Sequence, residues 1–271
     1  MTTIRKPWSR EETLLAVNLY CRIPFGKQHS RCREVIELAT AIGRTPSSVA
    51  MKLNNFTSLD PEEQARGVKG LSGASKLDRE IWEEITRNWE KVSAKSEYLW
   101  SQVVEQKIPF SNLPIQEKFS DNTSDDSAKS KDWLGSTETT RTITARLAQG
   151  FFRRTVLASY LNRCCISGIP VSELLVASHI LPWADYPDQR VNPCNGLCLS
   201  NLHDKAFDRG LITFDEEYRL VLGKRIKEFM TVEALRFNFL SYEGKQLTLP
   251  EKFLPDKQSL ARHREAIFCS D

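Results

Sequence analysis

The residues of this 271-residue chain with the clearest chemical potential lie between positions 177 and 210. Two of its four histidines, His179 and His203, fall there, with Asn195 between them and Asp204 and Asp208 directly after. An imidazole can accept a proton near neutral pH, and two carboxylates can bind one hard cation. This set predicts phosphodiester hydrolysis, which needs a base to activate water and a metal to stabilise charge on the phosphate.

The candidate base and its partner lie on different local structures. His179 follows the apolar run 174–177, which predicts a strand that ends near the imidazole. Asn195 lies in a loop rich in Pro, Asn and Gly, where its amide can bond either the imidazole or the neighbouring backbone. In both cases the asparagine would hold the histidine in position.

The candidate metal ligands lie on a segment, 198–208, that predicts a short helix. Asp204 and Asp208 are four residues apart, so a helix places both carboxylates on one face. His203 would point about 100° away from Asp204. It is therefore either a catalytic group and rival metal ligand or a residue packed beneath the helix.

The order His, Asn and a His/Asp helix, closed by Phe-Asp-Arg-Gly at 207–210, resembles the HNH nuclease finger, the ββα-metal fold. The resemblance extends over roughly residues 143–227 and includes a lead-in at 151–157 and a knuckle at 160–168. It implies that His179 is the general base, that Asp204 and Asp208 bind Mg²⁺ or Mn²⁺, and that double-stranded DNA is the substrate.

Two departures from the HNH pattern affect the metal chemistry. Ser178 occupies the position before the base, where many HNH fingers have an acidic or histidine ligand. No Cys-x-x-Cys pair occurs, and Ser200 and His203 stand where the second pair of a zinc knuckle would be. We therefore expect no structural zinc.

The N-terminal part predicts a helical domain. Ser9 and Glu12 form a capping-box pattern, and the apolar period at 33–42 predicts a helix that ends at Gly43. Thr45 and Pro46 then start another helix. Two helices joined by a short glycine turn predict a helix-turn-helix-like element that presents its second helix to nucleic acid.

The segment 22–31 joins a rigid apolar turn to a histidine and several bases, and is similar to the sulfur-binding domains of Mcr-type, phosphorothioate-dependent HNH endonucleases. A phosphorothioate sulfur is soft and poorly hydrated, so an apolar dimple with a cationic rim would suit it. Pro24 and Phe25 would form the dimple and His29 and Arg31 the rim. The expected nucleic-acid-binding residues are Pro24, Phe25, His29, Ser30, Arg31, Arg44, Ser47, Lys52, Asn54, Asn55, Lys69 and Arg190.

The sequence predicts an α+β protein with a helical DNA-recognition domain at 1–110, a flexible linker at 111–140, and an HNH domain with a helical tail at 141–271. Further elements are expected as helices at 78–94 and 231–240, a strand at 218–222 and a tail helix within 250–269. Trp82 and Trp89 are expected to pack in the core.

Composition and charge bear on the partners and the cellular location of the protein. A net charge of +3 does not by itself indicate nucleic acid, and seven cysteines without paired spacing indicate a reducing, cytoplasmic location. No apolar run approaches 18 residues, which predicts no membrane span.

These observations predict a metal-dependent DNA endonuclease of a restriction or defence system, dependent on phosphorothioate modification. The alternatives are a DNA-binding regulator with a degenerate finger and an RNA-cleaving HNH toxin. A homodimer is plausible because one finger cuts one strand.

Overall fold

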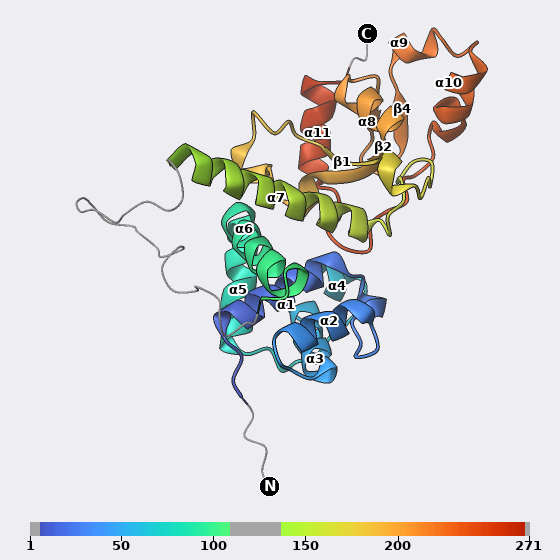
Figure 1. Ribbon diagram of the computed structural model, residues 1–271. Coiled ribbons are helices and arrows are strands. Elements are labelled where there is room, and N and C mark those ends of the chain that lie inside the picture. Colours follow the sequence, from blue (N-terminus) through green and yellow to red (C-terminus); the bar gives the residue numbers. More distant parts are fainter. Residues whose placement is uncertain (1–5, 109–136, 269–271) are drawn as a thin grey trace. The chain divides into compact units, whose positions relative to one another are not determined.

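The computed structural model describes residues 6–108 and 137–268 and has an α+β fold with two small antiparallel sheets (Figure 1). The described residues form two compact units. The first, helical unit comprises residues 6–20, 26–108 and 137–151, and the second comprises residues 21–25 and 152–268. The boundary falls within helix α7 (Thr137–Ser159), which begins inside the expected linker. Residues 111–136 of that linker lie outside the described ranges.

Helix α1 (Arg10–Arg22) runs through the core of the helical unit, and every residue from Glu12 to Tyr20 is buried. The predicted capping box starts this helix. The Glu12 backbone N–H donates to Ser9 Oγ over 3.1 Å, and the Ser9 N–H donates to Glu12 Oε2 over 2.8 Å. Burial on all sides explains why the helix departs from a simple amphipathic pattern.

The predicted pair of helices is confirmed as α2 (Arg33–Ala41) and α3 (Pro46–Thr57). Gly43, with φ of +65°, ends the first of them in the left-handed region that glycine adopts without strain. The Thr45 side chain accepts the Ser48 backbone N–H over 3.2 Å and caps the second. The two helices also pack against each other.

The helix expected at 78–94 is in fact two helices, α5 (Lys76–Arg87) and α6 (Trp89–Trp100). Asn88 leaves the helical region, with φ of −144° and ψ of 83°, and its side chain caps α6 by accepting from the Lys91 N–H. The interruption is therefore an N-cap inside an otherwise periodic pattern. The short helix α4 (Pro61–Ala65) and the π-helical turn Ser101–Glu105 complete the described helices of this unit before α7.

The second unit is built on a hairpin and a helix. Strand β1 (Leu175–His179) pairs antiparallel with β2 (Gly196–Ser200), so that His179 lies opposite Gly196. Helix α8 (Asn201–Asp208) follows β2 directly. The first three residues of the helix expected at 198–208 therefore belong to β2, a strand that was not predicted from the sequence. The order β1, β2, α8 is the expected ββα arrangement.

The remaining elements surround α8 in the second unit (Figure 1). Strands β3 (Ile212–Phe214) and β4 (Leu220–Leu222) form the second sheet, and α11 (Lys257–Ala266) packs against β3. The expected strand at 218–222 starts later because Tyr218 has a φ of +60°. The short helices α9 (Lys224–Lys227) and α10 (Glu233–Asn238) follow β4. Within residues 6–108 and 137–268, every helix is too short or too polar to span a bilayer.

Candidate active site

A cavity of about 530 Å³ opens between the end of β1 and the exposed face of α8. His179 lines it from the strand, and Asp204 and Asp208 line it from the helix. Lys205 and Arg209, next to the two aspartates, also border it. The fold therefore brings the predicted base and both preferred metal ligands to one cavity.

The imidazole of His179 is held on three sides. Its ring stacks on Phe152 with centroids 4.1 Å apart and planes 9° from parallel, and Trp183 meets it edge-on at 5.5 Å. Nε2 lies 2.8 Å from the carbonyl oxygen of Arg190. Because a carbonyl only accepts hydrogen bonds, Nε2 must donate, and in the neutral ring Nδ1 is the basic nitrogen.

The close fit around His179 depends on Gly196, opposite it on β2. A Cβ at this glycine would lie 2.4 Å from Val156 Cγ2 and 2.9 Å from Phe152 Cζ. A larger residue would therefore displace the aromatic ring on which the imidazole stacks. The glycine recognised in the Pro/Asn/Gly-rich loop is required for packing behind the base.

The histidines of the second unit share one arrangement and differ in one respect. His203 Nε2 bonds the Asn238 carbonyl over 2.9 Å, and His263 Nε2 bonds the Phe207 carbonyl over 3.2 Å, just as His179 bonds Arg190. However, Nδ1 of His203 lies 2.8 Å from Ser200 Oγ, and Nδ1 of His263 lies 3.0 Å from Thr213 Oγ1. Among the described residues, His179 Nδ1 has no such partner and remains available to accept a proton.

This comparison corrects the expectation for His203. Its side chain is fully buried, both ring nitrogens are engaged, and Cys164 Sγ lies 3.6 Å from Nδ1. It does not line the cavity that contains Asp204 and Asp208. Of the two alternatives for this residue, the structure supports the one in which it packs beneath the helix.

Asn195 positions the base indirectly. Its buried side chain accepts the Leu181 N–H over 2.8 Å, and it donates to the carbonyls of Leu181 and Gln189 over 3.3 and 3.1 Å. These bonds tie together the two ends of the loop that leads to Arg190, whose carbonyl orients His179. The asparagine therefore bonds the neighbouring backbone, one of its two expected roles, and does not bond the imidazole.

The electrostatics of the cavity favour a neutral base beside a cation site. Burial lowers the pKa of His179, against the opposing effects of the Arg190 carbonyl and the Asp204 charge. Burial and the neighbouring Asp204 raise the pKa of Asp208, against Lys205 and Arg209. Two carboxylates that repel each other at one cavity would gain from a cation placed between them.

The chemistry of these donors fits a divalent cation that keeps much of its hydration shell. Asp204 and Asp208 supply hard oxygen donors, and Ser178 Oγ, which is buried at the cavity, has no hydrogen-bond partner in the described chain. No group of three or more His, Cys, Asp or Glu side chains arranged to hold a metal occurs among the residues described. Mg²⁺ typically binds through one or two carboxylates, waters and substrate phosphates, which agrees with this set.

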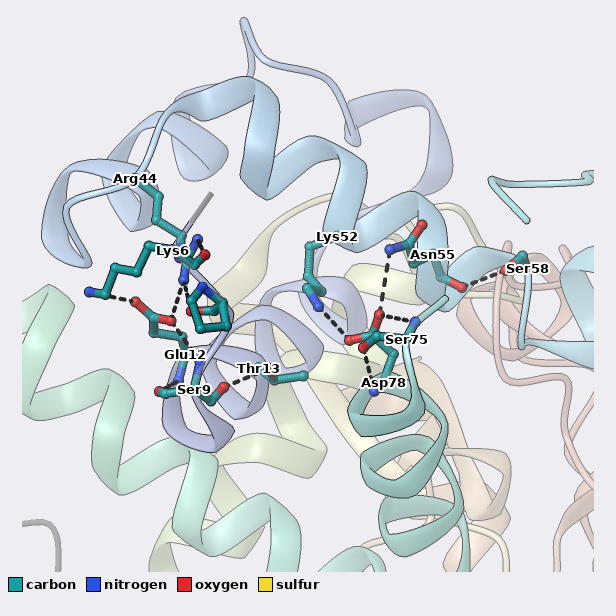
Figure 2. A network of polar contacts seen from close by, with 11 residues as sticks. Lys6, Ser9, Glu12, Thr13, Arg44, Lys52, Asn55, Ser58, Ser75 and Asp78 are labelled. Carbon is teal, nitrogen blue, oxygen red and sulfur yellow. Dashed lines mark hydrogen bonds and ion pairs between the residues drawn. The ribbon is translucent and has the colours of Figure 1, made fainter. Parts of the chain in front are cut away.

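In the helical unit, two of the expected nucleic-acid contacts instead form internal ion pairs (Figure 2). Lys52 Nζ lies 2.5 Å from Asp78, and Arg44 lies 2.7 Å from Glu12, with the paired side chains largely or fully buried. Lys52 was expected to point outward, but the helical period directs it into the core and exposes its neighbour Met51. Its pairing with Asp78 removes it from the expected interface, and the same reasoning removes Arg44.

The two asparagines of α3 are also engaged within the helical unit. Asn54 donates to the carbonyls of Gln28 and Ala50 over 3.0 and 2.8 Å, and Asn55 donates to Asp78 over 3.4 Å. These half-buried amides support the fold. Their expected contacts with bases would require these bonds to be exchanged.

The other expected contacts keep accessible side chains. In the helical unit His29, Ser30, Arg31, Ser47 and Lys69 are exposed. In the second unit Pro24, Phe25 and Arg190 are half-buried, and the Arg190 guanidinium donates from Nε to the Trp183 carbonyl over 2.6 Å.

Four residues of the candidate site were not predicted from the sequence. Phe152 and Trp183 hold the imidazole, and Lys205 and Arg209 place positive charge at the cavity. Each of the two cations directly follows one of the aspartates, Lys205 within α8 and Arg209 at its C-terminal cap, and a search for acidic ligands alone does not consider them. Phe152 had a signal in the lead-in at 151–157, but the sequence could not show that it stacks on His179.

The comparison with known families agrees with this geometry. Residues 164–215 match a family described as HNH endonuclease, and this range contains β1, β2, α8 and β3. No curated protein matches the chain. Residues 164–215 thus match an HNH endonuclease domain, and this match supports a nuclease that hydrolyses phosphodiester bonds in a nucleic acid. HNH nucleases generally depend on a divalent metal, which is consistent with the carboxylate pair.

Proposed function

We propose that the protein is a metal-dependent DNA endonuclease of a restriction or defence system, in which the helical domain selects DNA and the HNH domain cuts it. The observation that carries the proposal is the free Nδ1 of His179 in a cavity shared with Asp204 and Asp208. A base and a pair of hard ligands at one cavity are what metal-assisted phosphodiester hydrolysis requires.

In the proposed reaction, His179 Nδ1 takes a proton from a water molecule as its oxygen attacks phosphorus. The bond from phosphorus to the leaving oxygen breaks, and that oxygen takes a proton from solvent water. Asn195 and Arg190 keep the imidazole oriented through the loop they hold, and Phe152 prevents the ring from turning. Lys205 and Arg209 are placed to attract the phosphate charge.

The cation would be held by Asp204 and Asp208, with Mg²⁺ or Mn²⁺ as candidates. Such an ion, when bound, stabilises negative charge on the phosphate and on the leaving oxygen. Alanine at either aspartate should raise the metal concentration needed for half-maximal cleavage, because each carboxylate supplies an oxygen ligand.

Plasmid cleavage tests the proposal. Supercoiled plasmid is incubated with the full chain and Mg²⁺ or Mn²⁺, with EDTA as the metal-free control. Nicked or linear DNA that appears only with metal supports the proposal. Cleavage of RNA alone would favour the toxin, and DNA binding without cleavage would favour the regulator.

We further propose that the helical domain confers dependence on phosphorothioate modification. The exposed His29 and Arg31 of the helical unit supply polar and cationic groups that a modified backbone would meet. Matched plasmids, unmodified and phosphorothioated, test this point. Equal cleavage of both would leave a helix-turn-helix reader of ordinary DNA as the better account.

A homodimer would place two fingers on the two strands of one duplex. Sedimentation of the chain with and without DNA tests this, together with the ratio of nicked to linear product. A monomer that produces only nicked plasmid would contradict the dimer while leaving the nuclease proposal intact.

A further inference from the structure

A second cavity, of about 640 Å³, lies on the other side of the exposed ridge of α8 in the second unit, which we call the HNH unit because it contains the matched residues 164–215. Its lining is apolar where α8, α9 and α10 meet. Phe239 is buried beneath it, whereas Phe229 and Leu202 leave 55% and 48% of their surface exposed. Large apolar side chains that are exposed together at one groove are a feature of ligand-binding grooves. We refer to it as the α8–α10 groove.

The charges around the α8–α10 groove are of one sign. Lys205, Arg209 and Arg225 line it, and no acidic residue does. Within the described chain, none of these three cations forms a salt bridge. The groove thus combines an apolar floor with a cationic rim, which suits an anionic ligand that also has flat apolar faces.

The groove is connected to the active site through two of these cations. Lys205 and Arg209 line both this groove and the cavity that contains His179, Asp204 and Asp208. A polyanion with one phosphate at the catalytic cavity could therefore continue over α8 and remain next to positively charged side chains along the whole path. This continuity favours a strand of the substrate as the occupant over an unrelated small molecule.

We propose that the α8–α10 groove binds an unpaired nucleotide of the DNA strand beside the phosphodiester that is cut. The proposal rests on the proposed DNA endonuclease function and names the form of its substrate. The bases of an intact duplex are stacked inside the helix, so only an unpaired or extruded base can reach Phe229. Arg225 then meets the phosphate of that nucleotide, and a cavity of this size has room for it.

The test is equilibrium binding of the full chain, without divalent metal so that no DNA is cut. Two labelled duplexes of equal length are compared, one fully paired and one with a short unpaired stretch containing 2-aminopurine. We expect the second to bind more tightly and its 2-aminopurine emission to change on stacking. Phe229→Ala should weaken binding of the unpaired substrate about tenfold and abolish the emission change, while sparing the paired duplex.

Phe237→Ala is the matched control, because Phe237 is 70% exposed on neighbouring α10 and does not line the groove. It should behave as wild type. Likewise Arg225→Ala should flatten the salt dependence of binding by about 0.7 units, as expected for one phosphate on a single strand, and the neighbouring Lys224→Ala should do so less. Circular dichroism melting verifies that each variant is folded.

The outcomes separate this inference from the nuclease proposal. Equal binding of both duplexes by the wild type, or equal effects of the two phenylalanine variants, overturns the groove assignment even if plasmid is cleaved. A selective Phe229 effect supports it even if no cleavage is found. A Phe229→Ala variant that changes the sedimentation of the protein and not its DNA binding would identify the groove as a contact between copies, and would also overturn the assignment.

Discussion

Charged side chains have different surroundings in the core of the helical unit and at the cavity of the HNH unit. In the helical unit, Lys52 pairs with Asp78 and Arg44 with Glu12, in positions closed to solvent. In the HNH unit, Asp204 and Asp208 lie at an open cavity, and neither forms a salt bridge within the described chain. The buried ion pairs hold helices of the helical unit together, whereas the two carboxylates at the cavity have no salt-bridge partner among the described residues.

The three histidines of the HNH unit differ in the same way, because only some of them have partners for both ring nitrogens. His179, His203 and His263 all donate from Nε2 to a backbone carbonyl, but hydroxyl groups take up Nδ1 of the latter two. Chemistry is therefore expected where a hydrogen-bonding group has been left without an internal partner.

The largest effect is expected from removal of the base. His179→Ala should lower the cleavage rate by about two to four orders of magnitude, because the water loses its proton acceptor. His203→Ala should instead lower the free energy of unfolding, since it removes a buried ring with two hydrogen bonds. Single-turnover plasmid cleavage and thermal unfolding measure the two effects. A folded His203→Ala variant without activity would reverse the assignment.

The sequence was sufficient to bring the candidate site residues together, because they lie close to one another along the chain. His179, Asn195, Asp204 and Asp208 lie within 30 residues, and the period of α8 alone places the two aspartates together. It was insufficient for His203, because the carbonyl of Asn238 that engages this ring comes from a distant helix. The short strand β2 was hidden for a related reason: its residues are all buried, so they show no alternation.

In the helical unit the sequence predicts the secondary structure but not the roles of the charged side chains. Its helices and caps follow from local signals such as Ser9, Gly43 and Thr45, whereas the role of its cations does not. The side chain of Lys52 was assigned to DNA, but its partner Asp78 belongs to another helix, and only the packing of α3 on α5 brings the two charges together. A single sequence does not show which side chains from distant segments pair with one another.

The second prediction concerns this buried pair. Lys52→Met should lower the free energy of unfolding by about 3–5 kcal/mol, because it leaves the Asp78 carboxylate buried without its counterion. Lys52→Met combined with Asp78→Asn should recover part of the loss, since no net charge then remains buried. Urea denaturation measures both. Unchanged stability together with weaker DNA binding would return Lys52 to the nucleic-acid interface.

The third prediction is a difference in acid sensitivity between the units. Burial lowers the pKa of His263 to about 4, although the Phe207 carbonyl opposes the shift. The folded state thus favours the neutral ring and the unfolded state binds the proton, so stability is complete above about pH 6.5. It should fall by on the order of 3 kcal/mol as the pH drops towards 4.

The helical unit should respond at lower pH. Burial acts to raise the pKa of Glu12, but hydrogen bonds from Arg44 and Ser9 outweigh it and lower the pKa below 4.5. Its contribution is therefore present above that value and lost as the pH falls through the folded pKa. Hydrogen exchange followed against pH should show the HNH unit opening first, and His263→Gln should reduce that early loss. Simultaneous opening of both units would contradict the prediction.

The smallest effect tests whether α3 acts through its own stability or through its surface. Thr45→Ala removes the side chain that accepts the Ser48 N–H, and should lower the free energy of unfolding by about 1 kcal/mol. Ser47, two residues later, is exposed, so Ser47→Ala should change stability by less than about 0.5 kcal/mol. If α3 faces DNA as proposed, Ser47→Ala should nevertheless weaken binding of duplex by the full chain, whereas Thr45→Ala should affect binding only near its unfolding transition. Urea denaturation and duplex titration on the same two proteins separate these effects. Wild-type binding by Ser47→Ala would remove this face of α3 from the interface and leave the exposed His29, Ser30, Arg31 and Lys69 as the remaining candidates in the helical unit.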